Sequence, residues 1–255
     1  MDTSDPNAED YELLLPAEQQ TGGANGGVNT SKARQEDQMP GEGRRGDAVG
    51  KYAALTGAAL FMAVTWVVVL VNDPVNTGVF ALHPLLQSLS LLLFTYGILT
   101  LQPTSRPKTK TAGLARHQYA ILCAAFPAIF FGTFAVMYNK YLHGAVHFRS
   151  WHGKIGIACI GWLFVQILLG GGSVWFGGAA FGGGVKAKAI WKYHRLSGYV
   201  LYGLLVTTAH LGGAWSNWGN KYCPKSMRVL AYWAALVACL AGVYMRVRPS
   251  KMKFY

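Results

Sequence analysis

The sequence is poor in charged side chains, and those it has are unevenly distributed. Charged residues make up 13% of the 255 residues and hydrophobic residues make up 52%. The charged share is about half of that in an average soluble protein. The apolar stretches that follow Lys51 contain essentially no Asp or Glu. This composition argues against a soluble domain and indicates an integral membrane protein.

Cysteine is also scarce, and the positions of the four cysteines exclude two classes of protein. Cys123, Cys159 and Cys239 lie within apolar stretches, which leaves Cys223 alone in a predicted loop. Cysteines placed in this way do not form the disulfide framework of a small secreted protein. The sequence contains no C-x-x-C-H motif, so covalent attachment of a c-type haem is excluded.

The first fifty residues lack aromatic side chains almost completely and are rich in Gly, Asp, Glu, Gln and Asn. Such a segment cannot bury enough apolar surface to offset its chain entropy, so we predict a disordered tail over residues 1–50. The segment stays acidic through Glu12, unlike a signal peptide, which has a basic start and an apolar centre. We expect a transmembrane domain over residues 51–249 and a short C-terminal tail over residues 250–255.

Six apolar stretches are long enough to cross a bilayer, which requires roughly 20 apolar residues per helix. The sequence therefore predicts an all-α membrane protein with six transmembrane helices. Pro84 falls in the first turn of the second helix, where it is tolerated, and Pro127 is expected to kink the third. The predicted spans are approximately 52–71, 79–101, 115–138, 152–171, 189–212 and 228–245.

The distribution of Lys and Arg predicts the orientation. Of the 23 basic residues, 17 lie in the N-terminal tail, the 102–116 loop, the 172–195 connection and the C-terminus. Because cytosolic loops carry the excess of Lys and Arg, both termini are expected to be cytosolic. The same rule accounts for the net charge of +12 without a nucleic-acid partner. The glycine-rich stretch 172–188 is expected to be a flexible loop, and it lacks the G-K-[ST] ending of a phosphate loop.

Four of the seven histidines occupy equivalent places, near the start of the second to fifth spans. Because successive spans alternate in direction, His83 and His152 should share a depth near the non-cytosolic face. His117 and His194 should share a depth near the cytosolic face. Neutral imidazole is a haem-iron ligand, so each pair could hold one iron from opposite sides. The layers would be roughly 15–20 Å apart. Two filled axial positions suit electron transfer rather than oxygen chemistry.

Other interpretations of the histidines stay open from the pattern alone. A histidine near a helix end is commonly structural. Transport of zinc or copper is a second alternative, although such sites usually include carboxylates or thiolates. His143 and His147 lie in the connection between the third and fourth spans, where a solvated histidine is expected. His210 lies 16 residues after His194, so it faces roughly the opposite side of its helix and is predicted to be structural.

The residues around the four equivalent histidines resemble the eukaryotic cytochrome b561 family of ascorbate-reducible di-haem proteins, especially its small single-domain members. The resemblance covers about residues 52–245 and implies a central four-helix bundle, formed by the second to fifth helices, that holds two b haems. It implies the same histidine pairing as the topology. The segments that carry it are Leu82-His83-Pro84-Leu85-Leu86, Arg116-His117, His147-Phe148-Arg149-Ser150-Trp151-His152-Gly153 and Tyr193-His194-Arg195-Leu196-Ser197-Gly198-Tyr199.

The resemblance also implies a reaction, in which cytosolic ascorbate donates an electron and monodehydroascorbate or a ferric chelate accepts it on the other side. These substrates are anionic, so cationic residues at each mouth are candidates for binding them, although positive-inside charge explains the cytosolic ones equally well. Some family members have a lysine three residues before the third-helix ligand, where this sequence has Leu114. The candidates are Lys108, Lys110, Arg116, Lys188, Lys192 and Arg195 on the cytosolic side, and His147, Arg149, Trp151 and Lys154 on the other.

Residues 9–16 look like an acidic dileucine sorting signal in the cytosolic tail. The signal favours an endomembrane location, such as a vacuole, a lysosome-like organelle or a secretory vesicle, over the plasma membrane. Two other functions stay open: a haem-binding membrane anchor for a partner redox enzyme, and a non-haem polytopic transporter. The oligomeric state is also open, with a homodimer as one alternative.

Overall fold

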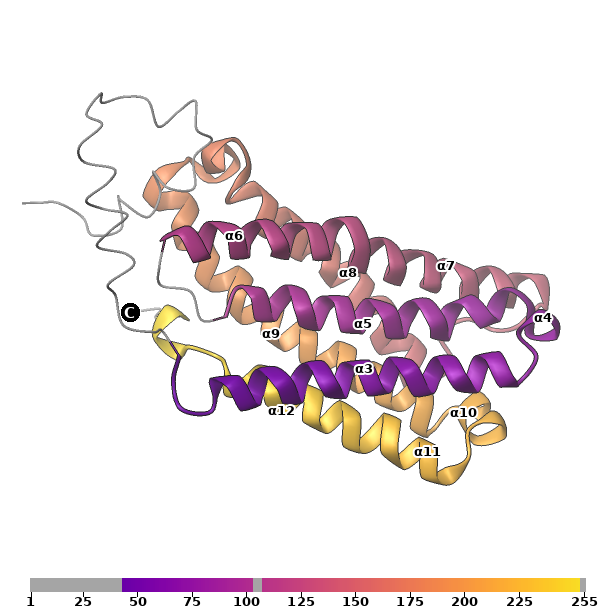
Figure 1. Cartoon of the computed structure of the whole chain (residues 1–255). Coiled ribbons are helices and arrows are strands. Elements are labelled where there is room, and N and C mark those ends of the chain that lie inside the picture. The colour runs from indigo at the N-terminus through magenta and orange to yellow at the C-terminus, as the bar shows by residue number, and fades with distance from the viewer. Residues whose placement is uncertain (1–42, 103–106, 253–255) are drawn as a thin grey trace, which may run out of the picture.

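The computed structural model describes residues 43–102 and 107–252, except for the side chains of Pro107 and Lys108. Every regular element in these ranges is a helix, and Figure 1 shows the long helices side by side in one bundle. The elements are α3 (Asp47–Val71), α4 (Pro74–Thr77), η2 (Gly78–Ala81), α5 (Leu82–Thr100), α6 (Pro107–Gln118), η3 (Tyr119–Ala125), α7 (Phe126–Leu142), α8 (Trp151–Gly172), η4 (Trp175–Phe181), α9 (Gly184–Ala214), α10 (Asn217–Tyr222), α11 (Lys225–Val229), η5 (Leu230–Ala235), α12 (Leu236–Met245) and η6 (Pro249–Met252).

Five of these helical segments are long and apolar enough to cross a membrane, which confirms an all-α membrane protein. They agree with the predicted first, second, third, fourth and sixth spans. The predicted fifth span lies within α9, which has 31 residues but is not among the five. Polar residues such as His194, Ser197 and Thr208 lower its hydropathy, so the count of six spans stays a prediction. The five segments are Asp47–Val71, Pro74–Thr100, Thr109–Leu142, Trp151–Gly172 and Lys225–Met245.

Hydrogen bonds in the core fix α9 against its neighbours. Tyr202 of α9 is completely buried. Its hydroxyl lies 2.8 Å from Oγ1 of Thr95 on α5 and 2.9 Å from Sγ of Cys239 on α12. Because a buried hydroxyl without a partner is costly, this three-residue cluster holds α9 in one register within the bundle.

The first and last long helices, α3 and α12, run side by side along one flank of the bundle (Figure 1). Small residues allow their backbones to approach closely. A Cβ added at Gly57 would stand 2.4 Å from the carbonyl oxygen of Ala235, and one at Gly242 would stand 2.4 Å from that of Gly50. Close contact through small residues is the usual packing of transmembrane helices.

The third span is continuous but changes its helical winding near Pro127. Residues Tyr119–Ala125 form a π-helical segment, and Pro127 stands in the first turn of the α-helix that follows. Pro127 has no N–H and would clash with the carbonyl four residues before it in a regular helix. The wider π turn accommodates the proline. Oγ of Ser90 donates a hydrogen bond to the Ala125 carbonyl at 2.7 Å.

The glycine-rich stretch between α8 and α9 is a compact turn rather than an open loop. Phe176, Gly177 and Gly178 are consecutive residues with positive φ. A Cβ at Gly178 would stand 2.4 Å from Cβ of Ala187. Glycine is therefore required at residue 178 both by its backbone conformation and by its packing against α9.

A buried ionic cluster joins the start of α3 to the chain that follows α12. Asp47 accepts a hydrogen bond from Arg248 at 2.6 Å. Arg246 donates to the main-chain carbonyl oxygens of Asp47 and Gln102, each at 2.5 Å. Asp47 and Arg246 are 6% and 5% exposed, so their charges depend on one another for compensation. Burial lowers the pKa of the Arg246 guanidinium.

Candidate functional site

The structure brings the four equivalent histidines together as two pairs, at opposite ends of the bundle. The ring centroids of His83 and His152 are 5.8 Å apart, and the ring planes are at 86°. The centroids of His117 and His194 are 6.3 Å apart, with planes at 90°. The pairs are those expected from alternating helix directions. Each pair joins one helix of the α5–α7 segment to one of the α8–α9 hairpin.

Three of the four rings are oriented by a main-chain carbonyl on the neighbouring helix. Nδ1 of His83 lies 3.0 Å from the Gly132 carbonyl oxygen, and Nδ1 of His117 lies 3.0 Å from that of Gly97. Nδ1 of His152 lies 2.8 Å from the Thr208 carbonyl oxygen. A carbonyl only accepts, so each Nδ1 donates. Nε2 is thereby left as the nitrogen able to bind a metal.

The fourth ring occupies the corresponding place without the hydrogen bond. His194 lies beside the main-chain carbonyl of Gln166 on α8, but its Nδ1 has no hydrogen-bond partner among the described residues. Gln166 is fixed by its side chain, which donates to Oγ of Ser197 on α9. The α8–α9 hairpin is thus tied together next to His194.

The second to fifth long helical segments, which are α5, α6–α7, α8 and α9, each carry one of the four histidines and one carbonyl that faces another of them. His83 and the Gly97 carbonyl lie 14 residues apart on α5, as do His194 and the Thr208 carbonyl on α9. Fourteen residues rise about 21 Å and return to nearly the same helix face. The two layers are therefore about 20 Å apart along the helices, at the upper limit of the expected 15–20 Å.

Glycines make room for the two rings of the α8–α9 hairpin. A Cβ at Gly212 would stand 2.7 Å from Cε1 of His152, and a Cβ at Gly170 would stand 2.8 Å from Cε1 of His194. Each of these glycines lies one helical turn after the carbonyl that faces the same ring, Thr208 and Gln166 respectively. Each of these two rings therefore lies against a main-chain carbonyl and a glycine that follows it one turn later.

The spacing of the paired rings would allow each pair to hold one haem iron. A metal held by Nε2 of both rings, at about 2 Å from each nitrogen, needs ring centres roughly 6 Å apart. Both pairs meet this requirement. No group of three or more His, Cys, Asp or Glu side chains that could hold a metal ion occurs in residues 43–102 and 107–252. Each pair supplies two nitrogens, which is the donor set that porphyrin-bound iron requires of the protein.

The predicted cytosolic cations lie around the end of the bundle that carries His117 and His194. Nζ of Lys110 lies 5.6 Å from the ring centre of Trp191, and Nζ of Lys192 lies 5.3 Å from that of Tyr193. Arg195 donates to the main-chain carbonyl of Lys251 at 2.6 Å. Arg116 is exposed on α6, and Lys188 is partly buried on α9. Lys108 is part of α6, with its side chain outside the described residues.

The predicted residues of the non-cytosolic side gather at the start of α8. Arg149, Trp151 and Lys154 are exposed, and Nζ of Lys154 lies 5.2 Å from the ring centre of Trp151. The ring of His147 lies 5.8 Å from that of Phe148. Their nearness to His152 follows from the chain, but none of the four lines the pocket found at this end of the bundle.

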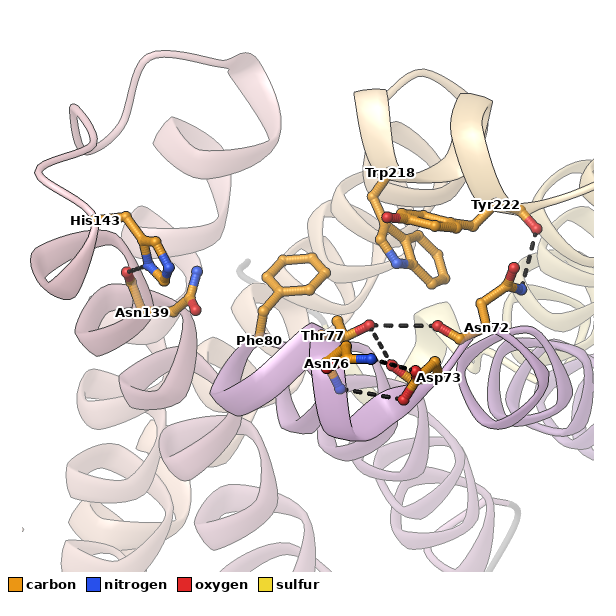
Figure 2. Close-up of a pocket in the computed structure, with 9 residues that line it drawn as sticks. All are labelled: Asn72, Asp73, Asn76, Thr77, Phe80, Asn139, His143, Trp218 and Tyr222. Carbon is orange, nitrogen blue, oxygen red and sulfur yellow. Dashed lines mark hydrogen bonds between the residues drawn. The ribbon is translucent and has the colours of Figure 1, made fainter.

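That pocket has a volume of about 450 Å³ and lies at the end of the bundle that carries His83 and His152. Its walls come from residues 72–80, which include α4 and part of η2, from the end of α7 and from α10, and Figure 2 shows the lining side chains. Most of its lining groups are amides, hydroxyls and aromatic rings, and Asp73 is the one carboxylate among them. The lining residues are Asn72, Asp73, Asn76, Thr77, Phe80, Asn139, His143, Trp218 and Tyr222.

One aromatic ring connects this pocket to the His83–His152 pair. The ring of Phe80 lies 6.0 Å from that of His83 and 6.4 Å from that of Trp218, another pocket residue. His143 is held by a hydrogen bond from Nδ1 to the Asn139 carbonyl at 2.7 Å (Figure 2). His143 is exposed in a turn, as expected for this connection, and it is also part of the pocket wall.

His210 has the contacts expected of a structural histidine. Its Nδ1 donates to the Tyr232 carbonyl at 2.7 Å, and its Nε2 accepts from Nε1 of Trp215 at 3.0 Å. Tyr232 belongs to the π-helical segment η5, whose winding leaves main-chain groups available to side chains. The ring of Trp233 packs edge-on against His210 at 4.4 Å.

The carbonyls that orient the rings, the glycines beside them, the pocket and Lys140 were not predicted from the sequence. Nζ of Lys140, in the last turn of α7, donates to the Val146 carbonyl at 2.9 Å, and its charge interacts with His152. Gly170 and Gly212 do have a regular spacing in the sequence, because each lies 18 residues after one of the paired histidines. The pocket residues come from three separate segments, 72–80, 139–143 and 218–222, and share no local pattern.

Comparison with known proteins identifies one family. Residues 78–219 match the family described as eukaryotic cytochrome b561. The matched region contains all four paired histidines and extends over more than half of the chain. A search of curated proteins found no match.

Proposed function

The chain belongs to the eukaryotic cytochrome b561 family, and from this premise we propose that it carries electrons from cytosolic ascorbate through two b haems to an acceptor on the other side of the membrane. Membership of the family implies haem b and transmembrane electron transfer. The number of haems, their ligands, the donor and the acceptor belong to the proposal.

The observation that supports two haems is the presence of two imidazole pairs, with ring centres 5.8 Å and 6.3 Å apart, at two depths. His83 and His152 would hold one haem, and His117 and His194 the other. When bound, haem supplies a one-electron iron couple whose potential the protein adjusts through ligands, hydrogen bonds and burial. The protein orients the rings through carbonyls and encloses the pairs among apolar helices.

We place the donor site at the end of the bundle where α6 and α9 carry basic residues. Ascorbate is an anion near neutral pH, and a positively charged mouth raises its local concentration. Arg116 and Arg195 adjoin the ligands His117 and His194 in sequence and are the nearest candidates. Lys108, Lys110, Lys188 and Lys192 extend the same positive surface.

We place the acceptor in the 450 Å³ pocket at the opposite end. Phe80 forms part of its wall and lies one ring from His83, so an acceptor in the pocket would be close to the haem of that layer. The amides of Asn72, Asn76 and Asn139 offer hydrogen bonds to an oxygen-rich molecule such as monodehydroascorbate or a ferric chelate. His147, Arg149, Trp151 and Lys154 offer a second, more cationic approach at the start of α8.

The orientation follows from six spans, with α9 as the fifth. Its 31 residues correspond to about 46 Å of helix, enough to cross the bilayer with its lysine-rich first turns in the cytosol. Both termini are then cytosolic. Residues 9–16, which suggest an endomembrane location, lie outside the described residues.

Reconstituted vesicles provide the test. The purified protein would be inserted into sealed vesicles that contain a ferric chelate, and ascorbate would be added outside. We expect haem reduction followed by reduction of the internal chelate, at a rate that depends on the protein. A protein without b-type absorbance would contradict the haem assignment. Haem that ascorbate does not reduce would contradict the donor and favour the alternative of a haem-binding anchor for a partner enzyme.

A further inference from the structure

The indole N–H of Trp191 is buried and has no hydrogen-bond partner among the described residues. Native proteins rarely leave a buried donor unpaired, because the lost hydrogen bond to water is not replaced. Trp191 lies on α9, three residues before His194, so it stands about one turn nearer the cytosolic end on a neighbouring part of the same face. An acceptor is therefore expected just outside the His117–His194 pair.

A cation faces Trp191 from the opposite helix. Lys110 lies on α6, seven residues before His117, which places it on the same face as His117 and two turns further out. Its Nζ lies 5.6 Å from the ring centre of Trp191. Trp191 and Lys110 thus face each other from α9 and α6, as His194 and His117 do one layer further in at 6.3 Å.

An ammonium group next to an unpaired N–H donor suits a carboxylate, which only accepts hydrogen bonds and binds cations strongly. Haem b carries two propionate carboxylates. A charged carboxylate is costly in an apolar interior, so the propionates of a haem held by His117 and His194 should point toward the cytosolic end. That direction leads to Trp191 and Lys110.

We infer that Nε1 of Trp191 and the ammonium of Lys110 form a carboxylate site that binds a propionate of the haem between His117 and His194, and so raise its midpoint potential. The inference rests on the haem occupancy proposed above. A propionate that is neutralised and hydrogen-bonded places less negative charge near the iron. The reduced iron, which carries one more electron, is favoured by that change.

The test compares two variants of the full-length haem-loaded protein in a spectroscopic redox titration. Trp191→Phe keeps an aromatic ring and removes the N–H, and Lys110→Met removes the charge. We expect the oxidised-to-reduced ratio of the cytosolic haem, at a fixed applied potential, to rise about threefold in Trp191→Phe and further in Lys110→Met. The midpoint potential of the other haem should be unchanged. Unshifted potentials in both variants would contradict the inference.

Matched controls separate this effect from a general loss of indole or charge. Trp66→Phe removes an N–H that donates to the Leu85 carbonyl at 3.2 Å, and Lys51→Met removes a cytosolic cation that lies over its neighbour Tyr52. Neither substitution should shift the midpoint potential of the cytosolic haem. If the controls shift it as much as the two variants do, the assignment to Trp191 and Lys110 is wrong.

Haem dimethyl ester, in which both propionates are esterified, identifies the anion. In protein loaded with this ester, Trp191→Phe and Lys110→Met should have the same cytosolic midpoint potential as the unaltered chain. A shift that persists in the ester-loaded protein would overturn the inference. A raised KM for ascorbate with unchanged midpoint potentials would show that the site binds the donor instead. Absence of haem from the unaltered chain would contradict the proposed function itself, which is a separate result.

Discussion

The imidazole ring of His152 lies directly against Gly212 of the next helix, so closely that a Cβ there would stand 2.7 Å from Cε1. His194 and Gly170 repeat the contact at the other end of the same hairpin, at 2.8 Å. In both cases the ring is held between the glycine and a carbonyl one turn before it. The hairpin formed by α8 and α9 is therefore built to hold two rings at fixed depths.

Replacement of either glycine should displace one ring. Gly212→Ala is expected to lower occupancy of the His83–His152 haem, and Gly170→Ala that of the His117–His194 haem. Overpacking of this kind typically costs about 1–3 kcal/mol. The haem-to-protein ratio, measured from the absorbance of the extracted haem, should fall from two toward one. Gly161→Ala, on α8 with Gly170, is the control, because its Cβ would meet nothing within 4 Å. Full occupancy in both variants would show that the glycines do not seat the rings.

Trp218 should matter for the acceptor and not for the donor. Its ring lines the pocket and lies 6.4 Å from Phe80. An aromatic contact contributes about 1 kcal/mol, so Trp218→Ala should raise the KM for the acceptor about fivefold. Reduction of the protein by ascorbate should be unchanged. Stopped-flow measurement of each half-reaction tests this.

Trp151→Ala is the matched control, because this exposed tryptophan belongs to the second approach at the start of α8. If Trp151→Ala raises the KM for the acceptor and Trp218→Ala does not, the acceptor binds near the start of α8 and not in the pocket.

The cluster around Asp47 should stabilise the end of the bundle where α3 begins and α12 ends. Asp47→Ala would leave the buried Arg246 and the partly buried Arg248 without their carboxylate. Loss of one partner from a buried pair costs about 3 kcal/mol, which corresponds to a fall of roughly 6–12 °C in Tm for a chain of this size. Arg45→Ala, which alters a nearby exposed arginine, should leave Tm unchanged. Thermal melts in detergent would compare the two, and equal Tm values would contradict a stabilising role.

Cysteine labelling should test the orientation. Burial raises the pKa of the Cys223 thiol, so at pH 7 little thiolate forms and the native thiol should react slowly with a membrane-impermeant maleimide. Its reaction should accelerate as the pH rises. In a Cys223→Ser background, Ala145→Cys should be labelled from the non-cytosolic side and Arg45→Cys only from the cytosolic side. The reverse pattern would invert the topology, with His83 and His152 then in the cytosolic layer.

The histidine pairs could be predicted from the sequence because they depend on two robust patterns. Apolar length sets the helices, and the alternation of helix direction decides which histidines share a depth. The family resemblance led to the same pairs. Hydropathy does not fix the number of spans, because α9 carries polar side chains such as Ser197 and Thr208 that form hydrogen bonds within the bundle. Hydropathy registers their polarity and not their burial.

The carbonyl and glycine contacts of the histidine rings could not be predicted, and neither could the pocket. Both depend on the rotation of helices about their axes. The Gly132 carbonyl and His83 are 49 residues apart, and no local pattern indicates that they meet. His143 is exposed, as its position in a connection predicted, but its place in a pocket wall with residues of α4 and α10 could not be predicted.

The pairing of the histidines is the central claim, and loss of single ligands tests it most directly. Each of the four histidines would be replaced in turn by alanine, and each purified variant would be followed through a reductive titration by its b-type absorbance. His83→Ala and His152→Ala should lose the same redox component, and His117→Ala and His194→Ala the other. Loss of the same component by His83→Ala and His194→Ala would contradict the account.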